Sequence, residues 1–161
     1  MATHIPQIHD LLSLETVRVG LPGQTKEDVL AALLDVLMTH PAVVDADAMR
    51  EAVFAREQVM STGVGKGLGL PHAKTHAVRQ TVAAFAITAE PVPFAAIDDQ
   101  PVRMLFLLVG PERATSEHIK VLSRISRLLN RDAFRQQLLD APDAASVLTL
   151  LEVAELQYAA G

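Results

Sequence analysis

The chain has 161 residues, half of them apolar, and carries a formal net charge of −5. This length and composition predict one domain over residues 1–161, with an ordered core over about 10–158. An acidic chain without a dense Lys/Arg cluster is not expected to bind nucleic acid, and a chain without cysteine can hold neither disulfides nor thiolate metal sites.

The sequence predicts no targeting or membrane-spanning segment. The N-terminal residues MATHIPQIHD contain no basic region followed by a long apolar run, which a signal peptide requires. The strongly apolar stretch 104–110 is far too short to cross a bilayer. We therefore expect a cytoplasmic protein that does not insert directly into a membrane.

Two helices are expected early in the chain. Apolar residues recur on one face of a helix over 26–39, which Thr25 can cap and Pro41 ends. A second helix over 48–58 follows Asp47 as its cap. The apolar face of the first helix consists of Val29, Leu30, Leu33, Leu34 and Leu37.

Strands are expected in the middle of the chain. Alternate glycines over 61–69 give the backbone too much freedom for a stable helix. Strand patterns follow over 67–73, 81–88 and 102–109, and the last is a near-continuous apolar run typical of a strand that is buried on both faces. A proline-containing loop over 91–101 separates the second strand from the third.

Three further helices are expected to close the chain, over 116–130, 132–140 and 144–159, each with a Ser or Asp near its start as a possible cap. Strands that are preceded and followed by helices are typical of an α/β fold. The pattern therefore predicts a single-domain sandwich in which helices flank a mixed β-sheet.

The glycine-rich segment matches neither common nucleotide-binding motif. A P-loop needs a Ser or Thr after Lys66 and a glycine at Met60, and the dinucleotide fingerprint would need a glycine at Leu68 or Leu70. The segment can be a flexible turn, or its small residues can let a phosphate or a partner surface approach backbone N–H groups. The residues that would form this approach are Ser61, Thr62, Gly63, Gly65 and Gly67.

His72 follows Pro71 at the end of the strand that the glycine-rich segment leads into. Proline cannot donate to a sheet ladder, so the strand is expected to end or to reach an edge there. A histidine held beside a flexible loop is suited to act as a nucleophile. Two alternatives stay open. His72 can be a structural or solvated side chain, or a metal ligand paired with His76. The second alternative needs a helix, because residues four apart lie side by side there, and the chain is predicted to be extended.

The sequence gives no support for a serine hydrolase, because the G-x-S-x-G motif is absent.

His118 is expected in the first turn of its helix, with Ser116 as the cap, where unpaired N–H groups and the helix dipole favour an anion. It begins an apolar stripe that continues through Leu122, Ile125 and Leu129, so its ring should point toward the core. A buried polar ring needs a partner. That partner is either a bound anion or a backbone carbonyl.

Arg56 follows Met49 and Val53 at the apolar spacing of the second helix, so its guanidinium is expected near the buried side. The planar fork of arginine suits the binding of a phosphate group. For a single arginine, an ion pair with Glu57 or another carboxylate is the simpler explanation.

These residues belong to a longer recognisable string. The segment 61–73, STGVGKGLGLPHA, resembles the active-site signature of enzyme IIA proteins of the bacterial phosphoenolpyruvate-dependent phosphotransferase system, in the fructose/mannitol and nitrogen-regulatory branch. The resemblance extends upstream to Arg56 and Glu57, and downstream through 101–112, 116–130 and the closing helix. One departure is Gly69, where the family commonly has alanine.

The resemblance implies a mixed sheet flanked by helices and a phosphoryl carrier without cofactor or metal. It places the phosphoryl group on Nε2 of His72, a second active-site histidine at His118 and the site's arginine at Arg56. The implied donor is an HPr-type phosphocarrier protein, and the implied acceptor is a IIB domain of a sugar transporter or a regulatory protein target. A sequence without fused IIB or IIC segments slightly favours the regulator. The alternative is a protein-binding module that keeps the fold without phosphotransfer.

Overall fold

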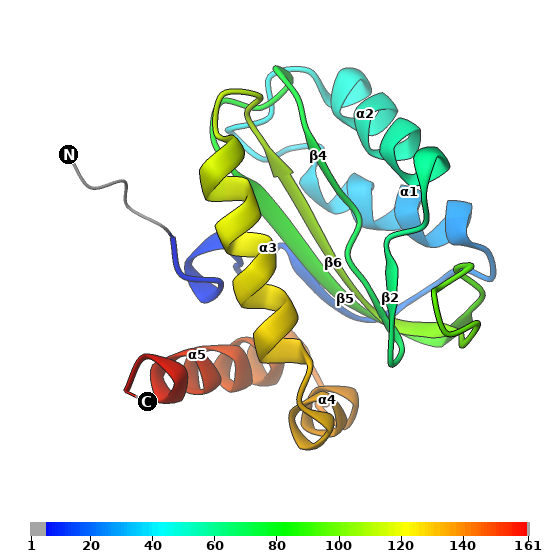
Figure 1. Ribbon diagram of the computed structural model, residues 1–161, viewed down its shortest axis with the longest axis vertical. Coiled ribbons are helices and arrows are strands. Elements are labelled where there is room, and N and C mark those ends of the chain that lie inside the picture. The colour runs from blue at the N-terminus through cyan, green and yellow to red at the C-terminus, as the bar shows by residue number, and fades with distance from the viewer. Residues whose placement is uncertain (1–5, 161) are drawn as a thin grey trace.

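Strands from both halves of the chain form one mixed sheet in the computed structural model, which describes residues 6–160 (Figure 1). The strands are β1 (Val17–Leu21), β2 (Gly63–Gly65), β3 (Leu68–Gly69), β4 (His72–Lys74), β5 (Val82–Val92) and β6 (Val102–Gly110). Their hydrogen-bonded order is β1-β5-β6-β3-β2, and β4 also pairs with β6. The central pair β5 and β6 is antiparallel, whereas β1 runs parallel to β5, and both β3 and β4 run parallel to β6.

Helices cover both faces of this sheet, which confirms the predicted α/β sandwich (Figure 1). One face is covered by α1 (Lys26–Leu37) and α2 (Ala46–Val59). The other is covered by the 3-10 turn η1 (His9–Leu11), α3 (Thr115–Leu129), α4 (Asp132–Leu139) and α5 (Ala144–Ala160). None of the helices within residues 6–160 combines the length and the apolar character that a membrane span requires.

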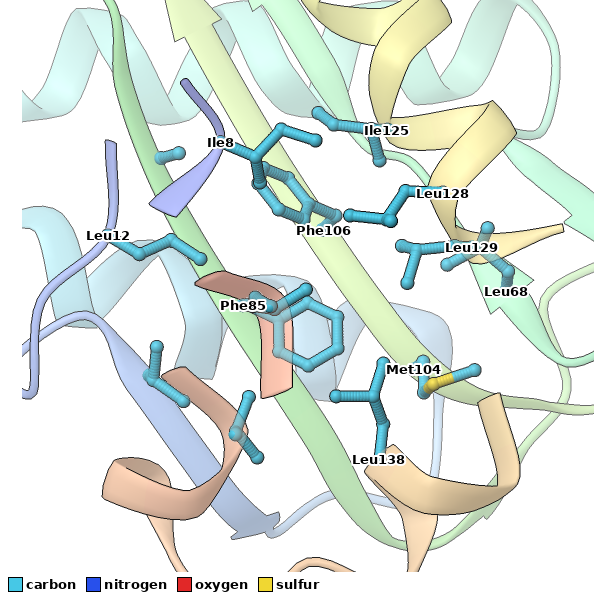
Figure 2. Close-up of a cluster of buried hydrophobic side chains, with 14 of the residues drawn as sticks. Ile8, Leu12, Leu68, Phe85, Met104, Phe106, Ile125, Leu128, Leu129 and Leu138 are labelled. Atoms are coloured by element: carbon cyan, nitrogen blue, oxygen red, sulfur yellow. The ribbon is translucent and has the colours of Figure 1, made fainter. Parts of the chain in front are cut away.

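The two central strands are buried on both faces, as the apolar run predicts. Between Met104 and Val109, even-numbered residues of β6 enter the core beneath α3, α4 and α5, whereas odd-numbered residues enter the core beneath α1 and α2. Figure 2 shows the first of these cores, in which the ring centroids of Phe85 and Phe106 lie 5.8 Å apart. The sheet therefore separates two apolar layers.

The strand predicted over 67–73 is present as two short strands, β3 and β4, which pair with β6 at the same offset. The interruption falls at Leu70 and Pro71. Proline has no N–H to donate, and the N–H of Leu70 donates at 2.9 Å to the Thr62 carbonyl instead of to β6. As a result His72 begins the second strand rather than ending the first.

Two strands, β1 and β2, were not predicted from the sequence. Strand β1 lies at one edge of the sheet and, among residues 6–160, pairs only with β5; of its five residues, the terminal Val17 and Leu21 are buried. Its three exposed central residues give no alternating apolar pattern, and Gly20 adopts a positive φ of 83°.

The cap of the first helix is as predicted, whereas that of the second differs. The Thr25 hydroxyl accepts from the N–H of Asp28, and the Asp28 carboxylate accepts in return from the Thr25 N–H, which forms a capping box. Helix α2 begins at residue 46, two residues earlier than predicted, because Asp45 and not Asp47 accepts the N–H of Ala48.

A buried carboxylate on α5 holds the N-terminal segment against the domain. Glu155 accepts hydrogen bonds from the backbone N–H groups of Ile8 at 2.7 Å and His9 at 2.6 Å. The Nδ1 atom of His9 lies 2.6 Å from the same carboxylate. These three contacts place Ile8 in the core shown in Figure 2.

We expect Glu155→Ala to lower the free energy of unfolding by about 2–4 kcal/mol, because two buried N–H groups lose their acceptor. Urea unfolding followed by circular dichroism measures the change. Glu152→Ala, an exposed position on the same helix, is the matched control and should change stability by less than about 0.5 kcal/mol. Equal effects of the two substitutions would contradict the anchoring role of Glu155.

Candidate functional site

The ring of His72 is held by the backbone beside it. His72 begins β4, opposite Leu108 of β6, and its Nδ1 atom lies 2.7 Å from the Leu70 carbonyl oxygen. A carbonyl can only accept, so Nδ1 carries the hydrogen in this contact and the lone pair of the neutral ring lies on Nε2. The contact thus selects the tautomer in which Nε2 can act as a nucleophile.

The surroundings of His72 keep the ring neutral near pH 7. Burial is the largest influence and lowers the pKa of His72 below its usual value. The hydrogen bond to the Leu70 carbonyl raises this pKa, the positive charge of Arg56 lowers it, and the negative charge of Glu57 raises it. Because the net direction is downward, the Nε2 lone pair is available at neutral pH.

The ring of His118 lies beside the ring of His72. The centroids of the two rings are 5.6 Å apart, with an angle of 51° between their planes. His118 is only 4% exposed, and within residues 6–160 neither of its ring nitrogens makes a hydrogen bond. The carbonyl considered as a partner from the sequence is therefore not found, and the unmet donor of this ring suits a bound anion.

Two features of the fold place the His118 ring. Helix α3 begins at Thr115 after Ala114, so Ser116 lies inside the first turn and is not the cap that the sequence predicts. His118 is still in the first turn, on the buried face of the helix. Gly110, at the end of β6, leaves room for the ring, because a Cβ atom there would lie 3.1 Å from Nδ1 of His118. Burial is the largest cause that lowers the pKa of His118, and together with the positive charge of a protonated His72 and of Lys74 it brings this pKa to about 4.

Two cations act on this pair of histidines. Arg56 donates from Nη1 to the Met60 carbonyl at 2.9 Å and lowers the pKa of His72. Lys74, two residues after His72 on β4, donates to the Thr115 hydroxyl at 3.1 Å and lowers the pKa of His118. Positive charge near two neutral rings favours a group that carries negative charge. Sequence reasoning missed Lys74, although its spacing of two residues along a strand places it on the same side as His72.

The glycine-rich segment forms a tight turn between β2 and β3. Gly65 and Gly67 have φ values of 96° and 77°, in the left-handed region that favours glycine. Gly63 packs closely on the loop before β6, because a Cβ atom there would lie 2.7 Å from Cβ of Ala96. These positions explain why glycines are needed in the segment, independently of any ligand. Gly69 differs, because a Cβ there would meet only the flexible end of Leu105 at 2.8 Å and two atoms of a phenylalanine ring at larger distances.

The polar residues of the segment are engaged within the protein. Ser61 donates from its hydroxyl to the Phe94 carbonyl at 2.6 Å and accepts from the N–H of Gly63 at 3.0 Å. The N–H of Thr62 donates to the Glu57 carboxylate at 2.8 Å. A phosphate approaching this segment would therefore meet small side chains rather than free N–H groups at Thr62 and Gly63.

Sequence reasoning named Glu57 but did not predict its contacts in the site. From the sequence, Glu57 was a possible partner of Arg56, but its carboxylate pairs instead with Lys26 of α1 at 3.0 Å. The side chain is 6% exposed. The two partners are 31 residues apart in the sequence, and no local pattern links them.

The structure gives His72 and His76 different surroundings. His76 is a surface residue whose Nδ1 lies 3.9 Å from the Glu112 carboxylate. In the part of the chain that the structure describes, no group of three His, Asp or Glu side chains is arranged to hold a metal ion.

Comparisons with known proteins find similar sequences and similar folds. Residues 10–153 match the family described as phosphoenolpyruvate-dependent sugar phosphotransferase system, EIIA 2. The fructose-specific EIIA component of the phosphotransferase system of Haloferax volcanii is 38% identical, over 94% of this chain and 99% of that protein. The crystal structure of the nitrogen regulatory protein IIA-Ntr from Neisseria meningitidis has a TM-score of 0.84 at 32% identity, covering 89% of this chain and 98% of that one. The mannitol enzyme IIA of Escherichia coli, solved in complex with phosphorylated enzyme IIB, shares the fold, with a TM-score of 0.76 at 23% identity over 88% and 97% of the two chains.

We expect the stability of the fold to depend on pH through His118. Its pKa of about 4 in the folded chain lies below the ordinary 6.5, so the unfolded chain binds more protons between these values. The free energy of unfolding should therefore fall as the pH is lowered from 6.5 toward 4, by as much as about 3 kcal/mol. His118→Phe should flatten this dependence in urea unfolding measured across the range. The exposed His76→Asn serves as the control, and a His118→Phe curve parallel to the wild type would show that the ring is not a buried neutral group.

Proposed function

The chain belongs to the EIIA 2 family of the phosphoenolpyruvate-dependent sugar phosphotransferase system, and we propose that it carries a phosphoryl group on Nε2 of His72. One observation supports this proposal above the others. His72 has its Nδ1 tied to a carbonyl and lies beside His118, a buried ring without a partner within residues 6–160. The first ring is an oriented nucleophile, and the second offers a hydrogen-bond donor to a group that arrives there.

In the proposed reaction, the donor is the phosphohistidine of an HPr-type phosphocarrier protein. The Nε2 lone pair of His72 attacks the phosphorus in line, the bond between phosphorus and the donor's ring nitrogen breaks, and that nitrogen keeps the electron pair. The Nδ1–H of His72 stays on the Leu70 carbonyl, which stabilises the positive charge that develops on the attacking ring. No nucleotide polyphosphate takes part, so no metal ion is required to neutralise one.

The charge of the transferring group would be shared by side chains around the two rings. His118 would donate a hydrogen bond to a phosphoryl oxygen, and the cations of Arg56 and Lys74 would stabilise the developing charge. The glycine-rich segment would shape the approach of the partner with its small side chains. The residues of this approach are Ser61, Thr62, Gly63, Gly65 and Gly67.

Two destinations for the phosphoryl group are supported by different relatives. The complex of the mannitol enzyme IIA with phosphorylated enzyme IIB supports onward transfer to a IIB domain, as does similarity to a fructose-specific component. Similarity to the nitrogen regulatory protein IIA-Ntr supports a regulatory role, in which the phosphorylated and free forms bind a target protein differently. A binding module without phosphotransfer is the weaker candidate, because it would have no need of an oriented His72 beside an unpaired His118.

Replacing His72 by Ala should abolish incorporation of acid-labile phosphate, because the attacking nitrogen is lost. The assay incubates the protein with phosphoenolpyruvate, enzyme I and the HPr-type donor, and follows the label on the chain. His76→Ala removes an exposed histidine four residues away and should be labelled like the wild type. Undiminished labelling of His72→Ala would refute the assignment of the phosphorylated residue.

A second assay separates the two destinations. The phosphorylated protein is mixed with IIB domains of fructose and mannitol transporters, and the label on each chain is followed over time. For a sugar-uptake component, the label should move to the IIB domain within seconds and leave His72 unmodified. For a regulator, the label should leave His72 only by spontaneous hydrolysis, at the same rate with the IIB domain as in buffer alone.

A further inference from the structure

A buried carboxylate near the active-site histidine has a complete set of partners. Glu57 of α2 is 6% exposed and pairs with Lys26 of α1 at 3.0 Å. It also accepts hydrogen bonds from the backbone N–H of Thr62 at 2.8 Å and from the Thr62 hydroxyl. The Lys26 ammonium lies 4.7 Å from the centre of the Phe94 ring. A buried ion pair carries a large desolvation penalty, so one with this many satisfied contacts points to a specific geometric role.

These contacts continue through the backbone to His72. The Thr62 carbonyl accepts from the N–H of Leu70 at 2.9 Å, and the Leu70 carbonyl accepts from Nδ1 of His72 at 2.7 Å. The chain of contacts therefore runs from Glu57 through Thr62 and Leu70 to the ring. Two hydrogen bonds join Glu57 to Thr62, and one hydrogen bond forms each of the two later links.

The segment between the two short strands is held from two sides: the Pro71 carbonyl accepts from the N–H of Leu108 on β6 at 3.0 Å, and the N–H of Leu70 donates to Thr62. Neither Leu70 nor Pro71 donates an N–H to β6, because Leu70 donates to Thr62 and proline has no N–H. Thr62 itself follows the end of α2 and precedes β2, so regular secondary structure does not fix it either. The side chain that holds it by both N–H and hydroxyl is that of Glu57.

We propose that Glu57 is a positioning residue for phosphoryl transfer at His72: it fixes Thr62, Thr62 fixes Leu70, and the Leu70 carbonyl keeps the ring in the tautomer with a free Nε2. The inference rests on the proposed function of His72. Glu57 does not touch the phosphoryl group, and Lys26 stabilises the carboxylate in its place.

The test substitutes Glu57 by Gln, which keeps the size of the side chain but removes the charge and replaces one acceptor by a donor. Phosphoryl acceptance in a single turnover should slow by about tenfold or more, because small displacements of a nucleophile reduce rates strongly. The ¹⁵N chemical shifts of the His72 ring should move away from a single Nδ1–H tautomer toward a mixture. Glu51→Gln, an exposed position on the same helix, is the matched control and should leave both measurements unchanged.

A second pair of variants tests the same chain of contacts from its other end. Lys26→Met removes the cation that Glu57 pairs with, and should change rate and tautomer in the same direction as Glu57→Gln. Lys26→Arg keeps the charge and should restore both toward the wild type. This pair decides the question even where Glu57→Gln does not fold.

The outcomes separate the inference from the proposed function. If the folded Glu57 and Lys26 variants keep the wild-type rate and a single His72 tautomer, and differ only in stability, the positioning role is refuted while phosphorylation of His72 stands. If the wild type itself takes up no phosphate on His72, the proposed function fails, whatever the tautomer of the ring.

Discussion

The hydrogen bond between Nδ1 of His72 and the Leu70 carbonyl is the contact on which the site depends. It determines which ring nitrogen carries the lone pair and, on the proposed function, which atom forms the bond to phosphorus. The contact is possible because the sheet is interrupted at Leu70 and Pro71, between two short strands that keep one offset along β6. The interruption thus lets the His72 ring reach the Leu70 carbonyl, while the strands on either side keep the same register with β6.

Much of the fold and the centre of the site can be predicted from local sequence. Apolar runs identify the two central strands, because burial on both faces leaves no polar positions, and the position of His118 in a helical stripe predicts its burial. Arg56 is predicted as a residue of the site, but its contact with the Met60 carbonyl is not.

The remaining features depend on contacts between distant segments. Strand β1 carries no alternating pattern because it lies at an edge, and its strand character comes from pairing with β5. Glu57 pairs with Lys26, and this ion pair can form only after α1 and α2 have packed on the same face of the sheet. The break in the predicted strand can be partly foreseen from the sequence, because Pro71 lies at it. The carbonyl that accepts the Leu70 N–H cannot be foreseen, because it belongs to Thr62, eight residues earlier.

The unpaired ring of His118 has a consequence for the energetics of the whole domain. Within residues 6–160 this buried polar ring makes no hydrogen bond, which makes the unphosphorylated fold less stable than its packing alone would allow. A phosphoryl oxygen that accepts from this ring offsets that penalty, and it does so only in the folded state. On the proposed function, phosphorylation and resistance to heat are therefore coupled, and the melting temperature of the chain reports how much of it carries phosphate.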